Sequence, residues 1–265
     1  MSEESVRAVC QFANYENMYY ERRIRNSELT DRYLPGVYTF VMQMYSMELC
    51  HPRRLAKEYN IIFHTDAVQA FGHIEIDVKK LGVDMLSASS HKFHGPKGCG
   101  FLYADKNTGI KPFIYGGGQE RGQRSGTENV PGILGMVKAA EISHRIMDEN
   151  NRKLRKINDY MTDRILNEID DCICNGNREN RLSNNINVSF GNIDGKALLV
   201  LLDMEGVYVS GASACNGGKE KSYVLSSLGV PEKYAEGTIR MTMDYTMNMK
   251  QADYCLLYTS DAADD

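Results

Sequence analysis

A lysine and a carboxylate stand at the ends of two predicted strands. Asp66 ends the apolar run IIFHTD, and Lys92 follows the run DMLSASS, with His91 directly before it. In an open parallel sheet, ligands bind beyond the carboxyl ends of the strands, so neighbouring strands would bring both groups to one crevice. A carboxylate keeps a pyridine nitrogen protonated, and a lysine can form a Schiff base. Together they make the protein side of a pyridoxal phosphate site.

Other residues of the same loop suit a phosphate, but each has a simpler explanation. Ser89 and His91 could donate hydrogen bonds to phosphate, and the turn at 95–96 would fix the loop, because glycine allows unusual φ and proline restricts it. A lysine after a strand is usually solvated, and an aspartate at a strand end usually caps a helix. His91 and His94 lack a cysteine or carboxylate to complete a metal set. Spacing alone does not favour the cofactor over these alternatives.

The segment from residue 55 to 105 must position these groups. LAKEY is typical of a helix end, and NIIFHTDAVQAFG (60–72) of a buried strand that runs into a loop. IDVKKLG (76–82) predicts a short helical connection, whereas VDMLSASS (83–90) and GFLYAD (100–105) predict further strands. Strand, crossover and strand in such short order indicate a parallel α/β sheet.

The second half has a mixed pattern. A helix is predicted over about 131–150 and continues with many charges to 169. Strands are predicted at SNNINVSF, VYVSGASAC and TIRMTMDY, around a helix at DGKALLVLLDMEG. This pattern predicts a partial large domain over 55–139 and a smaller α+β domain over 140–250.

Composition excludes several classes of protein. The 265 residues carry a formal net charge of −4, which gives no sign of a nucleic-acid or anionic-membrane partner. No apolar run reaches the length of a membrane span, and the polar start MSEESVRAVC is not a secretory signal. None of the seven cysteines is spaced as CxxC, and the Cys172-x-Cys174 pair is too tight for the usual zinc pattern. We therefore expect a cytoplasmic, reducing location, with most cysteines acting as small buried hydrophobes.

Four longer motifs occur in order along the chain and carry a family resemblance: FHTDAVQAFG, SASSHKFHGPKG, GGGQERGQRSGTEN and VSGASAC. Over roughly residues 55–245 the chain resembles the cysteine desulfurases, the NifS/IscS-like branch of the fold-type-I pyridoxal phosphate enzymes, which are aminotransferase class V-like. The resemblance implies a truncated large domain with a parallel-type sheet and a smaller α+β C-terminal domain. It also implies a homodimer with shared sites.

The resemblance assigns a role to each candidate cofactor residue. Lys92 would hold pyridoxal 5'-phosphate covalently, Asp66 would pair with its pyridinium nitrogen, and Gln69 would hydrogen-bond its phenolic oxygen. Ser89 and His91 would bind its phosphate, with His91 also at the catalytic centre. Thr127, in the motif RSGT, would reach the phosphate site of the neighbouring subunit. For Thr127 an N-cap of the following helix is the alternative, and both roles are compatible.

Cys215 and Arg240 would complete the chemistry. Small residues flank Cys215 in SGASACNGGKEKS, so its thiolate could be exposed and could travel. In the family the matching cysteine takes sulfur from L-cysteine as a persulfide, leaves L-alanine, and passes the sulfur to an acceptor protein for iron–sulfur clusters or tRNA thiolation. No resident metal is implied, although Cys215 could transiently ligate an iron–sulfur cluster. Arg240 would bind the substrate carboxylate, and a surface strand charge is its alternative.

Two further functions stay open from the sequence. One is another enzyme of the same fold, a selenocysteine lyase or an aminotransferase. The other is a catalytically dead fragment that only binds partners, because family members are expected to be longer at the N-terminus. Residues 1–54 show no readable pattern and are expected to be out of frame. The C-terminal stretch CLLYTSDAADD, residues 255–265, is expected to be a foreign tail.

Overall fold

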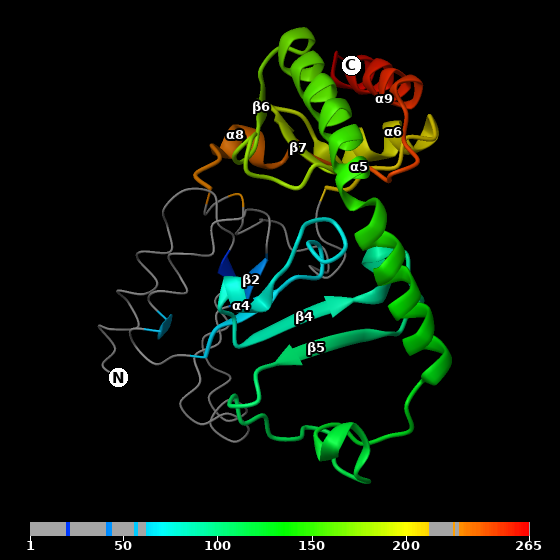
Figure 1. Ribbon diagram of the computed structural model, residues 1–265. Helices are drawn as coiled ribbons and strands as arrows, with labels where there is room; N and C mark the ends of the chain where they lie inside the picture. Colours follow the sequence, from blue (N-terminus) through cyan, green and yellow to red (C-terminus); the bar gives the residue numbers. More distant parts are fainter. Residues whose placement is uncertain are drawn as a thin grey trace, which may run out of the picture. The chain divides into compact units, whose positions relative to one another are not determined.

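The computed structural model describes residues 62–211 and 228–264, with short stretches at 20–21, 41–43, 56–57 and 225; side chains are described as far as Thr259. The chain divides into two compact units, Met1–Met147 and Asp148–Asp265 (Figure 1). The division falls within α5 (Val130–Glu168), so this helix contributes to both units. We describe each unit by itself.

The sheet of the first unit carries the predicted lysine loop. Its order is β1-β2-β3-β4-β5. The strand β3 pairs in parallel with both β2 and β4, whereas β1 and β5 are antiparallel to their neighbours. The bounds are Tyr20–Glu21 for β1, Val41–Gln43 for β2, His64–Asp66 for β3, Met85–Ser89 for β4 and Gly100–Ala104 for β5.

The connections between the strands explain why β4 is parallel to β3 but antiparallel to β5. The short helix α4 (Val78–Leu81) joins β3 to β4; the Asp77 side chain accepts from the backbone N–H groups of Lys79 and Lys80, and Gly82 ends the helix at φ 60°. The predicted parallel pair at β3 and β4 is therefore confirmed. The next strand, β5, pairs antiparallel with β4, because the connection through η1 (Ser90–Phe93) is too short for a crossover.

The second unit has a sheet of three antiparallel strands in the order β6-β7-β8. The strands are β6 (Cys172–Cys174), β7 (Asn185–Phe190) and β8 (Thr238–Thr242). Side chains alternate between the two faces of each strand, and one face packs into a large apolar cluster. Its fully buried members on the strands are Ile186, Val188, Phe190 and Ile239.

Helices complete this second unit. They are the later part of α5, α6 (Gly195–Met204), α8 (Glu232–Ala235) and α9 (Met249–Asp264). Asp194 caps α6 by accepting from the backbone N–H groups of Lys196 and Ala197. The helices α6 and α9 lie against each other, and both supply buried residues to the same cluster, among them Leu198, Leu202 and Leu256.

The long helix, α6, β7 and β8 are confirmed. A strand was predicted at VYVSGASAC. In the described part of this segment the structure has only an isolated antiparallel bridge between Ser210 and Arg240. The strand β6 and the helix α9 were not predicted; β6 is too short to show a period, and α9 falls largely in the segment expected to be foreign. Among the described helices, none is both long and apolar enough to cross a membrane.

Candidate active site

The register of the first sheet brings the candidate carboxylate and lysine to one edge. Asp66 is the last residue of β3 and pairs with Ser87 of the parallel strand β4. Beyond the end of β3, the Ala67 backbone N–H donates to the Ser87 carbonyl at 2.9 Å. Two residues later β4 ends, and η1 begins with the segment that contains Lys92. Both residues therefore lie at the carboxyl ends of adjacent parallel strands, where ligands of such sheets bind.

The Asp66 carboxylate also stabilises its own turn. Its Oδ1 accepts from the Val68 backbone N–H at 2.9 Å, and the side chain is half-buried. This Asx-type turn resembles the capping alternative for an aspartate at a strand end, and it fixes where the carboxylate lies. Gln69 follows in the same turn and is also half-buried. The turn thus holds both side chains beside the end of β3.

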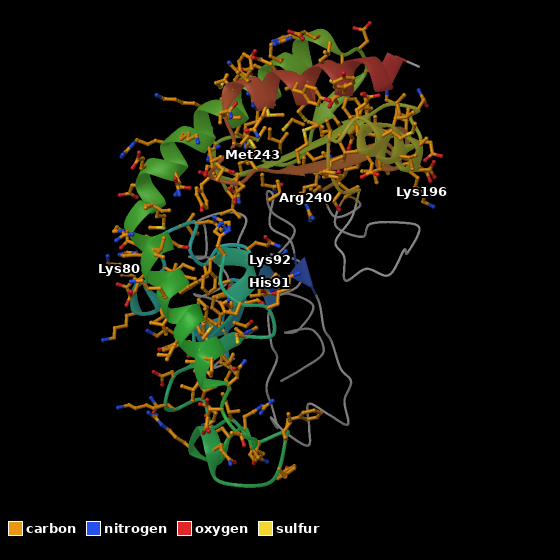
Figure 2. The ribbon with its side chains drawn as sticks, turned by 90° about the vertical axis from the view of Figure 1, so that its right-hand side faces the viewer. Lys80, His91, Lys92, Lys196, Arg240 and Met243 are labelled. Carbon is orange, nitrogen blue, oxygen red and sulfur yellow. The ribbon has the colours of Figure 1, made fainter. Side chains whose placement is uncertain are left out.

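Lys92 lies on the single helical turn η1, and polar residues surround it. In η1, His91 is exposed and Lys92 is half-buried, and Figure 2 shows the two side by side. Ser89 Oγ and His91 Nδ1 share a hydrogen bond of 2.9 Å, so the two predicted phosphate ligands lie next to each other. His73 Nε2 shares a hydrogen bond of 3.1 Å with the Lys92 carbonyl oxygen. The sequence gave no sign of this contact by His73, because it depends on two loops meeting in the fold.

Close packing fixes the position of η1. Phe93 is buried, and its ring centroid lies 4.9 Å from that of Phe71. An ideal Cβ on Gly72, which has φ 83°, would lie 2.7 Å from the Phe93 Cβ. A Cβ on Gly95 would overlap the buried Ser90 Oγ. Gly95 is therefore needed for space and not, as expected, for an unusual φ, since the described glycine of this turn with positive φ is Gly98.

A half-buried histidine lies next to the candidate carboxylate. His64 Nε2 shares a hydrogen bond of 3.0 Å with Ser87 Oγ, and His64 Nδ1 is buried with no hydrogen-bond partner in the described part of the chain. Burial lowers the pKa of His64, and the nearby negative charge of Asp66 opposes that shift only in part. His64 therefore favours its neutral form beside the edge where Asp66 lies.

Thr127 lies in the exposed loop before α5, and it does not cap that helix. The helix begins at Val130, and Asn129 Oδ1 accepts from the Gly132 backbone N–H at 3.2 Å, so Asn129 is the capping residue. The N-cap alternative for Thr127 is therefore wrong. The Thr127 side chain is exposed, and nearby Ser125 is buried with its Oγ donating to the Gly117 carbonyl at 2.8 Å.

The predicted substrate arginine lies in the second unit. Arg240 is half-buried on β8, opposite Asn187 of β7, and its backbone N–H donates to the Ser210 carbonyl at 2.6 Å (Figure 2). Its Nε is buried and has no hydrogen-bond partner among the residues that the structure describes. Cys215 lies outside the described residues.

The described cysteines are less buried than expected, since most cysteines were expected to be small buried hydrophobes. Cys255 is buried, whereas Cys99, Cys172 and Cys174 are half-exposed. The described residues contain no cluster of three or more His, Cys, Asp or Glu side chains that could hold a metal ion.

Comparison with known proteins now identifies the family. The family model for aminotransferase class-V matches residues 48–254. The chain belongs to the aminotransferase class-V family. The family and the fold class predicted from the sequence motifs are thus confirmed.

Individual members of the aminotransferase class-V family are also similar to the chain. A protein named cysteine desulfurase IscS from Dictyoglomus turgidum is 49% identical over 204 residues, which are 77% of this chain and 52% of the relative. The cysteine desulfurase IscS of Methanosarcina thermophila is 47% identical over 203 residues, covering 76% and 50%. The NifS-like protein of Rickettsia africae has a solved structure that matches with a TM-score of 0.77 at 29% identity, covering 86% of this chain and 61% of that one. The chain spans about half the length of the curated relatives it matches.

Proposed function

We propose that the chain is part of a pyridoxal phosphate-dependent cysteine desulfurase, a sulfurtransferase that converts L-cysteine to L-alanine and leaves the sulfur as a persulfide on Cys215. One observation carries the proposal: the register of β3 and β4 places Asp66 and the Lys92 segment at the same edge of a parallel pair. The similarity to proteins named cysteine desulfurase supports it.

The residues present at this edge fit pyridoxal phosphate. Lys92 supplies the amine that binds the aldehyde, and Asp66 supplies a carboxylate for the ring nitrogen, its position fixed by the Val68 backbone N–H. Ser89 and His91, already hydrogen-bonded to each other, supply donors for the phosphate, and Gln69 supplies an amide for the phenolic oxygen. When bound, the protonated ring acts as an electron sink for the bonds at the substrate Cα.

Arg240 and Cys215 would act on the amino acid itself. The unpartnered Nε of Arg240 suits a carboxylate, which can accept two hydrogen bonds from a guanidinium. Cys215 would act as the thiolate that attacks the substrate sulfur, forming an S–S bond while the C–S bond breaks. A sulfur-acceptor protein for iron–sulfur clusters or tRNA thiolation would then take the sulfur, in a cytoplasmic setting.

We further propose that the chain forms a homodimer through the stretch that contains Thr127. This stretch and the start of α5 expose large apolar side chains, which monomeric proteins rarely gather in one region. They are Phe113 (69% exposed), Tyr115 (70%), Val130 (55%) and Leu134 (65%). A neighbouring subunit would cover them and bring Thr127 toward a second phosphate site.

The proposal is tested by mixing the purified chain with pyridoxal phosphate. We expect the yellow absorbance of a lysine-bound cofactor, its loss in Lys92→Ala, and its retention in Lys97→Ala, whose lysine is exposed in the same loop. With L-cysteine, Cys215→Ser should keep the colour and form no persulfide. Retention of colour without any persulfide in the unmodified chain would favour another lyase or an aminotransferase of this fold, and persulfide formation by Cys215→Ser would contradict the role of Cys215. Absence of colour in the unmodified chain would favour the catalytically dead fragment.

A further inference from the structure

Two cysteines of the second unit have no role in the site proposed above. Cys172 and Cys174 are the first and last residues of β6, an edge strand that pairs only with β7 within the described sheet. Side chains two apart on a strand share a face, and their Cα atoms are separated by about 6.6 Å. Both side chains pack at the margin of the apolar cluster and are half-exposed, so small solutes reach them.

The surroundings of Cys172 keep it protonated. Its Sγ donates to the Ile169 carbonyl at 3.1 Å and lies 3.4 Å from the Ile165 carbonyl, so the thiol hydrogen has backbone acceptors. Burial raises the pKa of Cys172, and the negative charges of Asp171 and Asp170 raise it further. Cys172 is therefore suited to react second, as a thiol.

Cys174 has the opposite surroundings. Its Sγ accepts from Arg181 Nη1 at 3.5 Å. The Arg181 guanidinium is held in place because its Nε donates to the Asn177 carbonyl at 2.7 Å and its Nη2 donates to the Asn175 carbonyl. The Arg181 guanidinium therefore holds a fixed positive charge against the Cys174 sulfur. The two sulfurs thus differ in their neighbours, which are carbonyl oxygens for Cys172 and a guanidinium for Cys174.

We propose that Cys174 and Cys172 form a redox-active dithiol, separate from the proposed desulfurase site, that is oxidised by hydroperoxides to an intramolecular disulfide. The Cys174 thiolate attacks one peroxide oxygen; an S–O bond forms, the O–O bond breaks, and the other oxygen leaves as water or an alcohol after taking a proton. The Cys172 sulfur then attacks the Cys174 sulfenic acid, forming the S–S bond and releasing water that carries the Cys172 proton. A small-molecule dithiol reverses the oxidation by exchange.

The position of the pair explains why the disulfide would be labile. A disulfide needs Cα atoms about 4.4–6.8 Å apart and closer Cβ atoms than an extended strand provides, so β6 must bend to form it. An edge strand of three residues, paired with one neighbour, can yield in this way. Strained disulfides are the ones that reduce readily, which suits a reversible switch.

A peptide-level experiment tests the proposal on the full chain. Trypsin cuts after Arg164 and Arg178, so both cysteines fall in the peptide 165–178. After brief treatment with hydrogen peroxide, we expect this peptide to be lighter by two hydrogen atoms and to regain them with dithiothreitol. A peptide that only gains oxygen, or that stays unchanged while Cys99 is oxidised, would overturn the proposal.

Variants assign the order of reaction. In Cys172→Ser, a sulfenic-acid trap such as dimedone should label Cys174, whereas Cys174→Ser should leave Cys172 unlabelled; the reverse labelling contradicts the mechanism. Arg181→Gln keeps an N–H donor but removes the charge, so oxidation should slow about tenfold. Cys99→Ser is the matched control and should oxidise at 165–178 as the unmodified chain does. Because these readouts need neither cofactor nor L-cysteine, their failure leaves the proposed desulfurase function untouched, and the reverse also holds.

Discussion

The buried clusters of the two units are built from different side chains. In the first unit the described cluster consists mostly of alanines, with three larger members: Phe63, Val83 and Leu86. In the second unit the cluster is dominated by large aliphatic residues and methionines, most of them from α5, α6, α9, β7 and β8. Small side chains let backbone segments approach closely, whereas large ones fill the space between elements that lie further apart.

This difference indicates how each unit holds its functional residues. The loop around Lys92 is fixed by close approaches in which Gly72 and Gly95 leave no room for a Cβ. The strand with Arg240 is instead carried on a sheet whose other face is covered by large apolar side chains. The stability of the first unit should therefore be most sensitive to larger side chains near the Lys92 loop. The stability of the second unit should be most sensitive to smaller side chains in its core.

The largest change in the free energy of unfolding is expected when a buried side chain of the second unit is shortened. Ile186 is fully buried on β7, the central strand of the sheet, so Ile186→Ala leaves a cavity and should lower the free energy of unfolding by about 2–5 kcal/mol. Val200 is 60% exposed on α6, and Val200→Ala should change it by less than about 0.5 kcal/mol. Urea unfolding followed by circular dichroism measures both, and equal costs would show that the cluster does not support this unit.

A smaller effect is expected from adding one methyl group to the first unit. Gly95→Ala would force the buried Ser90 hydroxyl to move, at a cost of about 1–3 kcal/mol, and should displace η1. Gly118, with φ −84° and no atom within 4 Å of an ideal Cβ, is the control, and Gly118→Ala should be nearly neutral. Thermal unfolding and the yellow absorbance with pyridoxal phosphate are the readouts. A Gly95→Ala variant with unchanged stability and colour would mean that this contact relaxes freely.

The same contrast explains how much of the fold the sequence could predict. Elements with a long or regular apolar pattern, such as α5 and β7, were predicted because their own residues specify them. The direction of β5 was not, because it depends on the length of one connection and not on the strand's own residues. The strand β6 was missed, since three residues between an acidic turn and a polar one show no period.

The positions of candidate site residues could be predicted from the sequence where those residues stand at the ends of strands. Asp66 and Lys92 follow apolar runs, so a parallel pair brings them together whatever the loops do. The contacts that orient them were not predictable, because they join residues from separate loops: His73 with the Lys92 carbonyl, and Gly72 against Phe93. The unpartnered Nε of Arg240 was likewise not visible in a sequence that shows only a charged strand residue.

The smallest effect concerns protonation beside the lysine loop. Burial lowers the pKa of His64 below 6.5, so between its folded pKa and 6.5 the unfolded chain binds a proton that the native protein does not. The free energy of unfolding should therefore fall as pH drops through and below 6.5. His64→Gln, which keeps a partner for Ser87 Oγ, should weaken this fall, whereas exposed His144→Gln should not. Urea midpoints at about pH 7.5 and about pH 5.5 measure the difference. If the urea midpoint shifts equally between the two pH values in the unmodified chain and in His64→Gln, then protonation of His64 does not change the free energy of unfolding. The packing around the loop would then accommodate the charged imidazole.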